Sequence, residues 1–247
     1  MSRRSLPLAL VPLLVGGSAP PPRTEVGRIV GTVEISTALT TRRPRFRIYA
    51  DAGPGSVPPA QPRNDAVTEV RNVIVYLEAA PDRSAGAGTV DDASNDRVDS
   101  LRHGVMAQSD ERFEPHVLPV LRGARVDFPN RDDVYHNVFS LSRVRTFDLG
   151  RYPKGSSKSV NFSKTGIVQV FCHIHSDMSA IVFVLANPFF SAPDANGQYV
   201  IDNVPPGEYT IVGWHERTRP VSQRVRVVAG QATTLNFNLP LETRPGT

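Results

Sequence analysis

The residues best suited to chemistry lie together in one short stretch, VFCHIHSDM, residues 170–178. This stretch contains the only cysteine of the 247-residue chain, two of its six histidines and one of its three methionines. Thiolate, imidazole and thioether groups together suit a soft or borderline metal. The spacing Cys-x-x-His-x-x-Met predicts that Cys172, His175 and Met178 can converge on one metal ion from a tight loop between two strands.

A site of this kind needs a further ligand from a neighbouring strand, and His136 in VDFPNRDDVYHNVFS is the natural candidate. Two imidazoles and a thiolate in a trigonal set, with a weak axial thioether, form the blue-copper arrangement. Structural zinc is the competing metal because it also binds cysteine and histidine, but zinc sites rarely recruit methionine. Taken singly, a cysteine in a strand is most often a small buried hydrophobic residue. The four residues in one pattern favour copper.

Two motifs around these residues resemble the cupredoxin family, the group of plastocyanin, amicyanin and azurin. In that family a strand of the type V-x-F-x-N-x-D leads into a histidine followed by asparagine, and here VDFPNRD leads to His136 and Asn137. The second motif, Cys-x-x-His-x-x-Met, has the short spacing of amicyanin. The resemblance covers roughly residues 101–187, which is an ordinary size for one sandwich domain.

The resemblance implies a Greek-key β-sandwich that holds one copper ion per chain. His136, Cys172 and His175 would be the equatorial ligands, and Met178 would be the axial one. Asn137 would tie the two ligand loops together, and its backbone amide would donate a hydrogen bond to the cysteine sulfur. Such a bond would tune the reduction potential of the metal.

The other candidate groups do not favour an enzyme. His173 follows the cysteine directly, so in an extended strand its side chain points the other way. In multicopper oxidases and copper nitrite reductases, a histidine beside the cysteine carries the electron to a second copper, but those enzymes need further paired histidines. The remaining histidines are isolated: His103, His116 and His215. We therefore interpret His173 as a surface residue or a support for the ligands, and Asp132 and Asp133 as a solvated turn.

The elements that must position these residues are short strands. Proline (22) and glycine (18) are plentiful, and no segment has a convincing amphipathic helical pattern. Apolar and alternating runs predict strands within 26–35, 73–77, 112–130 (two strands about a turn at Arg122–Gly123), 138–141, 159–162, 167–172, 179–185, 198–204, 209–214, 222–228 and 233–239. The chain is predicted to be all-β and sandwich-like.

The C-terminal region resembles a second family. ANGQYVIDNVPPGEYTIVGWHE is similar to carboxypeptidase-regulatory-like or transthyretin-like sandwiches, which run G-x-Y-x-I and then a V-P-P-G-x-Y turn. Gly31–Val33 and Val73–Leu77 fit the opening of the same family. The resemblance implies a second small β-sandwich built from 26–81 together with 188–241. Proteins that combine the two pieces resemble exported proteins labelled methylamine-utilisation or plastocyanin-like.

The N-terminus predicts export. In MSRRSLPLALVPLLVGGSA, Arg3 and Arg4 precede a short apolar run and then small residues, which is the pattern of a signal over residues 1–23. The mature chain is thus expected to be periplasmic or otherwise exported, without a membrane span. A lone cysteine in such a compartment calls for an explanation such as a reactive thiol, an intermolecular bridge or a metal ligand. The formal charge of +4 is modest and forms no basic stripe, so nucleic acid is not an expected partner.

These observations together predict an exported type 1 (blue) copper protein in one-electron transfer, and not an enzyme. The resemblance implies a transient redox partner, such as a cytochrome or a copper or quinone enzyme. The electron port would be His175, with Ile174 and Ala180 in a small docking patch. Three alternatives remain open: a periplasmic copper carrier or scavenger, a domain of a larger copper enzyme that uses His173 as a bridge, and a structural module with a vestigial metal site.

Overall fold

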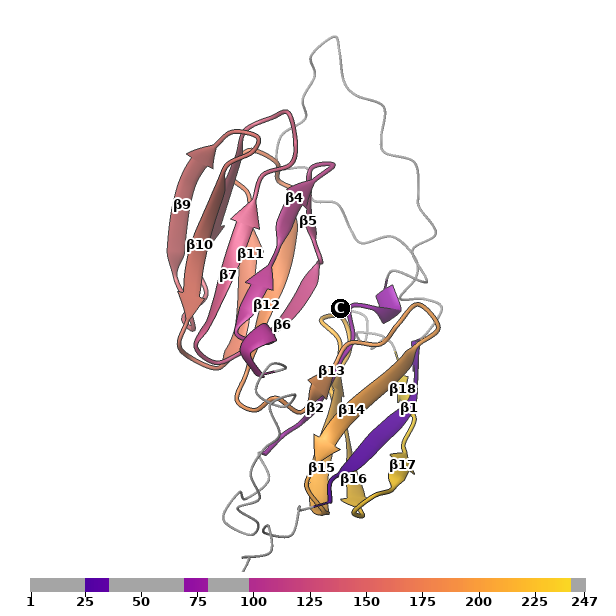
Figure 1. Cartoon of the computed structure of the whole chain (residues 1–247). Coiled ribbons are helices and arrows are strands. Elements are labelled where there is room, and N and C mark those ends of the chain that lie inside the picture. The colour runs from indigo at the N-terminus through magenta and orange to yellow at the C-terminus, as the bar shows by residue number, and fades with distance from the viewer. Residues whose placement is uncertain (1–24, 36–68, 80–97, 241–247) are drawn as a thin grey trace, which may run out of the picture.

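The computed structural model describes residues 25–35, 69–79 and 98–240. The predicted export signal at 1–23 lies outside these residues. The described residues form an all-β sandwich structure, with short helical turns only at 69–70 and 98–100. None of the helices among them is long and apolar enough to cross a membrane. The strands gather in two units, which we call the upper unit (β3–β12) and the lower unit (β1, β2 and β13–β18) after their places in Figure 1.

The upper unit consists of two facing sheets and a hairpin, β4–β5. One sheet has the order β10-β7-β3 and the other β6-β12-β11-β8-β9. The strands are β3 His103–Val105, β4 Ala107–Ser109, β5 Arg112–Glu114, β6 Val117–Leu121, β7 Ala124–Pro129, β8 His136–Ser140, β9 Phe147–Tyr152, β10 Ser157–Phe162, β11 Gly166–Phe171 and β12 Ser179–Leu185. Because successive side chains of a strand point to opposite faces, alternate residues such as Val126 and Phe128 fill the space between the sheets.

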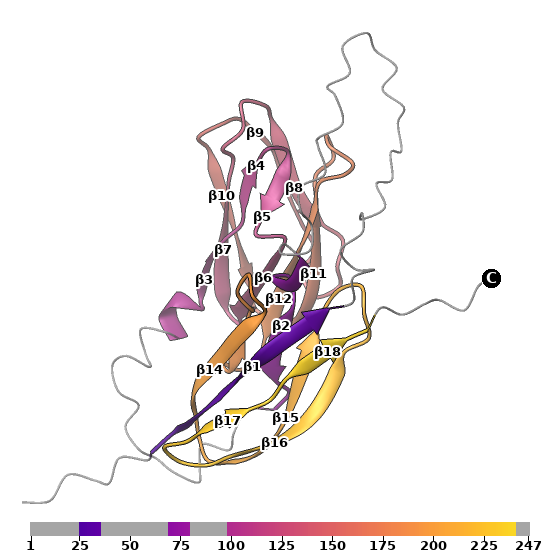
Figure 2. The same cartoon turned by 90° about the vertical axis from the view of Figure 1, so that its right-hand side faces the viewer.

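Two antiparallel strands of the upper unit explain why residues far apart in the sequence meet. β8 begins at His136, and β11 ends at Phe171, the residue before Cys172. The two strands pair with Phe171 opposite Phe139, so the start of one lies beside the end of the other. The loop before β8 and the loop between β11 and β12, which carry the predicted ligands and which we call the ligand loops, therefore gather at one end of the sandwich, away from the lower unit (Figure 2).

The lower unit joins strands from near both ends of the chain. Its sheets have the orders β14-β1-β17, with β18 also paired to β1, and β13-β2-β15-β16. The strands are β1 Gly27–Ile35, β2 Ile74–Leu77, β13 Phe190–Ser191, β14 Gln198–Val204, β15 Gly207–Trp214, β16 Val221–Val227, β17 Ala232–Thr234 and β18 Phe237–Leu239. Gly31 is required where β1 crosses the β17–β18 connection, because a Cβ atom there would lie 1.7 Å from the carbonyl oxygen of Leu235.

Some strand predictions differ from the structure. The segment 112–130 was expected to hold two strands but holds three, because the β5 strand ends at Glu114 and β6 starts at Val117. The last predicted strand, 233–239, is divided into β17 and β18, and both pair in parallel with β1. The turn predicted at Arg122–Gly123 is present, with Gly123 at a φ of 91°.

The two units pack through an apolar cluster of their own. The outer face of β12 contributes residues that contact β2, β13 and β15 of the lower unit, and Phe183 packs edge-on against Trp214 with ring centres 4.9 Å apart. The buried members are Ile74, Val117, Ile181, Phe183, Leu185, Phe190 and Trp214. At its edge the Nε2 atom of His116 lies 2.9 Å from a carboxylate oxygen of Glu216.

Candidate metal centre

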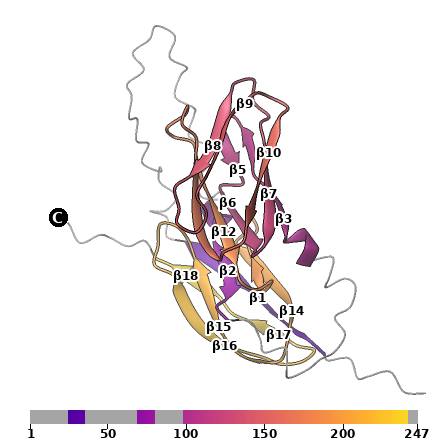
Figure 3. The same cartoon turned by 90° about the vertical axis from the view of Figure 1, so that its left-hand side faces the viewer.

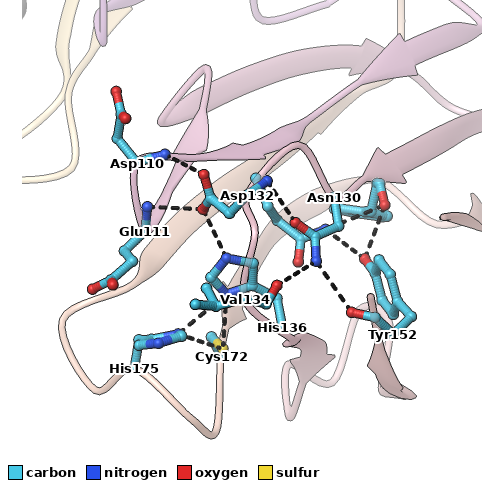
Figure 4. Close-up of polar contacts among 11 residues, drawn as sticks. Asp110, Glu111, Asn130, Asp132, Val134, His136, Tyr152, Cys172 and His175 are labelled. Carbon is cyan, nitrogen blue, oxygen red and sulfur yellow. Dashed lines mark hydrogen bonds and ion pairs between the residues drawn. The ribbon is translucent and has the colours of Figure 1, made fainter. Parts of the chain in front are cut away.

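Three predicted ligands converge at the end of the upper unit (Figure 4). The Nδ1 atoms of His136 and His175 are 3.1 Å apart. The Sγ atom of Cys172 lies 3.9 Å from Nδ1 of His136 and 3.8 Å from Nδ1 of His175. Among the described residues, this is the cluster of histidine, cysteine and carboxylate groups compact enough to hold a metal ion.

The size of this triangle fits a bound metal. With metal–nitrogen bonds of about 2.0–2.1 Å, a metal–sulfur bond of about 2.3 Å and angles of about 100–130°, the nitrogens would be about 3.1–3.8 Å apart, and each would be about 3.3–4.0 Å from the sulfur. The three measured distances lie within these ranges. The residues present therefore fit a transition metal held by two nitrogens and one sulfur.

The loop that carries three of the four predicted ligands is closed by its own backbone. The N–H of Cys172 donates to the carbonyl oxygen of Met178 at 3.1 Å, and the N–H of Met178 donates to the carbonyl oxygen of His175 at 3.0 Å. Met178 is buried in the same core cluster as Cys172. These bonds fix the backbone positions of the loop residues relative to β11 and β12. The ligand role of Met178 stays a prediction.

Burial affects the protonation state of the second histidine. His175 is partly buried, and the loss of hydration lowers its pKa below the ordinary value. The nearby carboxylate of Glu111 opposes this shift. Because a metal binds the neutral imidazole, a lowered pKa favours the binding-competent form of His175 near neutral pH.

Asn137 links the two ligand segments through its side chain. Its Oδ1 atom accepts a hydrogen bond of 3.3 Å from the N–H of His173, and its Nδ2 donates to Asp148 at 2.7 Å. The start of β8 is thus joined to the residue that follows Cys172. The predicted bond from the backbone amide of Asn137 to the sulfur stays a prediction.

Asp132 is not the solvated residue that the sequence predicted. Its side chain is 15% exposed, whereas that of Asp133 is 89% exposed and pairs with Lys154. One carboxylate oxygen of Asp132 lies 2.8 Å from Nε2 of His136. Although burial opposes its ionisation, bonds from the N–H of Glu111 and from His136 lower the pKa of Asp132 below its ordinary value. A single sequence gives little sign that Asp132 is buried against His136, since adjacent aspartates are typical of solvated turns.

The other histidines lie apart from the cluster. His173 is exposed, and its ring stacks on Phe139 at 3.8 Å between centres and 9° between planes. The remaining three each contact a carboxylate: His103 with Asp127, His116 with Glu216 and His215 with Glu69. Within the described ranges, no second group of metal-ligating residues accompanies His173.

Comparisons with known proteins give partial structural likenesses. The chain matches no known protein-family profile and no curated protein. Among solved structures, it is similar to a copper-containing nitrite reductase from Thermus scotoductus SA-01, with 23% identity and a TM-score of 0.33 over 34% of this chain and 22% of that one. A purple cupredoxin from Nitrosopumilus maritimus is 19% identical, with a TM-score of 0.31 over 33% of this chain and 99% of that one. A mutant amicyanin with Cu(I) is 23% identical, with a TM-score of 0.32 over 34% of this chain and 83% of that one.

Proposed function

We propose that this protein is an exported type 1 copper protein that carries single electrons. The observation that supports this proposal is the donor triangle of His136, Cys172 and His175, whose edges fit a bound transition metal. Met178, buried in the next turn of the same loop, is the axial thioether in this proposal. A thiolate, two imidazoles and a weak thioether favour copper over zinc. Bound copper would supply a Cu(II)/Cu(I) couple at this site.

The protein contributes rigidity to electron transfer. His136 is fully buried at the start of β8, and the loop after β11 is closed by backbone hydrogen bonds. Ligands held this way keep nearly one geometry in both oxidation states, so little of the surrounding structure has to reorganise when an electron arrives or leaves. Burial of Cys172 also keeps water from the sulfur.

The route to a partner runs through the exposed side of the ligand loops. His175 is the least buried of the three clustered ligands. Exposed apolar side chains occur in the same loops, with Ile174 40% and Tyr135 57% exposed. Ala180 was expected in this docking patch but is buried in the core, because it is the first residue of β12 to face between the sheets. A small apolar surface of this kind suits a transient redox partner, such as a cytochrome or a copper or quinone enzyme.

The deciding experiment is to load the purified protein with one equivalent of Cu(II) and record visible absorption, EPR and copper content. We expect an intense thiolate-to-copper band, a narrow hyperfine splitting and one copper per chain. The Cys172→Ser variant should lose the band, because a serine hydroxyl cannot supply the thiolate transition. A colourless protein that binds zinc or no metal would contradict the proposal. Ready transfer of Cu(I) to an acceptor chelator would favour copper delivery instead.

A further inference from the structure

A two-residue turn stands beside the donor triangle. The hairpin β4–β5 turns at Asp110 and Glu111, and both have positive φ, 53° and 54°. Hairpin turns of this kind normally use pairs such as Asn-Gly or Asp-Gly, because few residues other than glycine, asparagine and aspartate adopt positive φ. Glu111 in this conformation is therefore unusual, and we expect contacts that stabilise the turn.

These contacts are made by the carboxylate of Asp132. The N–H of Asp110 donates to its Oδ1 atom at 2.7 Å, and the N–H of Glu111 donates to its Oδ2 atom at 2.9 Å. The N–H of Asp132 donates to Oδ1 of Asn130 at 2.9 Å. The amide of Asn130 in turn donates to the carbonyl oxygen of Val134 at 2.8 Å. The loop before His136 is thus held by two sets of hydrogen bonds, one from the Asp110–Glu111 turn and one involving the side chain of Asn130 (Figure 4).

The same carboxylate determines which nitrogen of His136 carries the proton. Its Oδ2 atom lies 2.8 Å from Nε2 of His136. A carboxylate only accepts hydrogen bonds, so Nε2 is the N–H in this contact, and in the neutral ring Nδ1 then keeps its lone pair. That lone pair belongs to the atom 3.9 Å from Sγ of Cys172, in the donor triangle.

We infer that Asp132 is a positioning residue that holds His136 as the Nε2–H tautomer, with Nδ1 directed at the proposed metal site. The N–H groups of the Asp110–Glu111 turn hold the Asp132 carboxylate in place. The inference rests on the proposed metal site but concerns the protein without metal. Because His136 is fully buried, no bulk water can replace the carboxylate as the acceptor for its Nε2–H. The hydrogen bonds from the turn fix the position of the Asp132 carboxylate, and the carboxylate in turn fixes the orientation of the His136 ring.

The test uses the metal-free full chain with ¹⁵N-labelled histidines. Long-range ¹H–¹⁵N correlation spectra distinguish the two tautomers of a neutral ring, and the His136 signals are assigned from their loss in His136→Gln. We expect the Nε2–H tautomer in the wild type and a substantial Nδ1–H population in Asp132→Ala. Asp133→Ala is the matched control, because Asp133 neighbours Asp132 but is 89% exposed. An unchanged tautomer in Asp132→Ala, or an Nδ1–H wild type, would overturn the inference.

A second variant covers the case in which Asp132→Ala does not fold. In Asp132→Asn, an amide cannot accept all three hydrogen bonds, so either the His136 tautomers mix or a turn N–H becomes free to exchange with solvent. If neither the tautomer nor the amide exchange of Asp110 and Glu111 changes, the inference is wrong. Tautomer spectra do not depend on copper, so this result stands even if the proposed function fails.

Metal affinity gives an independent readout. Residues that orient a ligand histidine typically contribute 10- to 100-fold to affinity. We expect chelator competition with Zn(II) as the probe to show a loss of this size in Asp132→Ala and less than about 3-fold in Asp133→Ala. Equal losses in both variants would overturn a specific role for Asp132.

Discussion

The proposed ligand role of Met178 can be tested only with a substitution that leaves the packing of the core unchanged. Met178 is fully buried among the core residues of the upper unit, so any substitution must first preserve volume. Leucine is close to methionine in size, and such exchanges usually cost less than about 1.5 kcal/mol of folding free energy. Met178→Leu therefore removes the thioether while it keeps the packing of the loop.

We predict that Met178→Leu still binds one copper and has a higher reduction potential. In the proposed site the thioether donates weakly to the metal, and its loss stabilises the electron-rich Cu(I) form over Cu(II). Protein-film voltammetry measures the potential, and thermal unfolding of the metal-free variant controls for packing. A lower potential, or a loss of copper by a variant that folds normally, would count against an axial thioether.

At the scale of single residues, the sequence predicted the clustering of His136, Cys172 and His175, because a pattern of rare residues carried the information. That these residues and Met178 bind a metal stays a prediction. Cys172, His175 and Met178 are few in kind and closely spaced, and His136 precedes an asparagine in a recognisable motif. The contacts of Asp132 escaped notice because they involve a turn more than twenty positions away in the chain. Long-range contacts of this type have no local signature in one sequence.

Strands β3, β7 and β10 are joined on their outer face by a polar network centred on Asp127. Its carboxylate accepts from the hydroxyl of Ser159 and from His103, and Arg125 binds it at 2.9 Å. The bond from Ser159, followed by that from His103, lowers the pKa of Asp127 to about 2. Each of the three strands of this sheet therefore contributes a side chain to one charged group.

We predict that this network stabilises the fold at neutral pH and loses its effect in acid. The folded pKa of about 2 is below the ordinary value of 3.8. The stabilisation is therefore complete above about pH 4 and disappears as the pH falls toward 2. Asp127→Asn should lower the free energy of unfolding by about 1 kcal/mol at pH 7, a small value because the network is partly exposed, and by less at pH 3.

Urea unfolding at the two pH values measures this difference. Asp133→Asn is the control, because Asp133 lies in a turn and is almost fully exposed. An equal effect of Asp127→Asn at pH 7 and pH 3 would show that the loss comes from altered packing and not from the ionised carboxylate.

Element predictions succeeded where a strand carries a clear apolar or alternating run, and they missed others, including the six-residue β9 and the three-residue β4. The alternating run of β7 and the apolar run of β12 were both anticipated from their patterns. The hairpin β4–β5 was missed, because its strands have three residues each and its turn lacks the Asn-Gly or Asp-Gly pair that marks such turns. The hydrogen bonds to Asp132 supply what the local turn sequence lacks.

The arrangement of the two units follows from β12. In SAIVFVL, residues 179–185, apolar side chains occupy both faces of the strand. Val182 and Val184 fill the core of the upper unit, while Phe183 and Leu185 face the lower unit. A continuous apolar run is typical of a strand that is buried on both faces. The sequence of β12 therefore indicated that its outer face is covered by another part of the protein. The lower unit lies at the end of the upper unit that is away from the ligand loops (Figure 3).

We predict that Phe183→Ala weakens the interface between the upper and lower units without changing the proposed metal site. Phe183 packs against Tyr76 and Trp214 of the lower unit, so its removal leaves a cavity at the interface that costs about 3 kcal/mol. Trp214 is the only tryptophan in the chain, so its fluorescence reports on this interface. We expect one unfolding transition in the wild type, and a red-shifted emission with two separate transitions in Phe183→Ala.

Phe139→Ala is the matched control, because Phe139 lies on the same sheet and stacks on the exposed His173 ring, not on the lower unit. It should leave the Trp214 emission unchanged. Copper-loaded Phe183→Ala should keep the EPR spectrum of the wild type, since the ligand loops lie at the end of the upper unit that is away from the lower unit (Figure 2). A single transition with unshifted emission in Phe183→Ala would mean that the apolar cluster does not hold the units together, and an altered EPR spectrum would mean that the lower unit shapes the metal site.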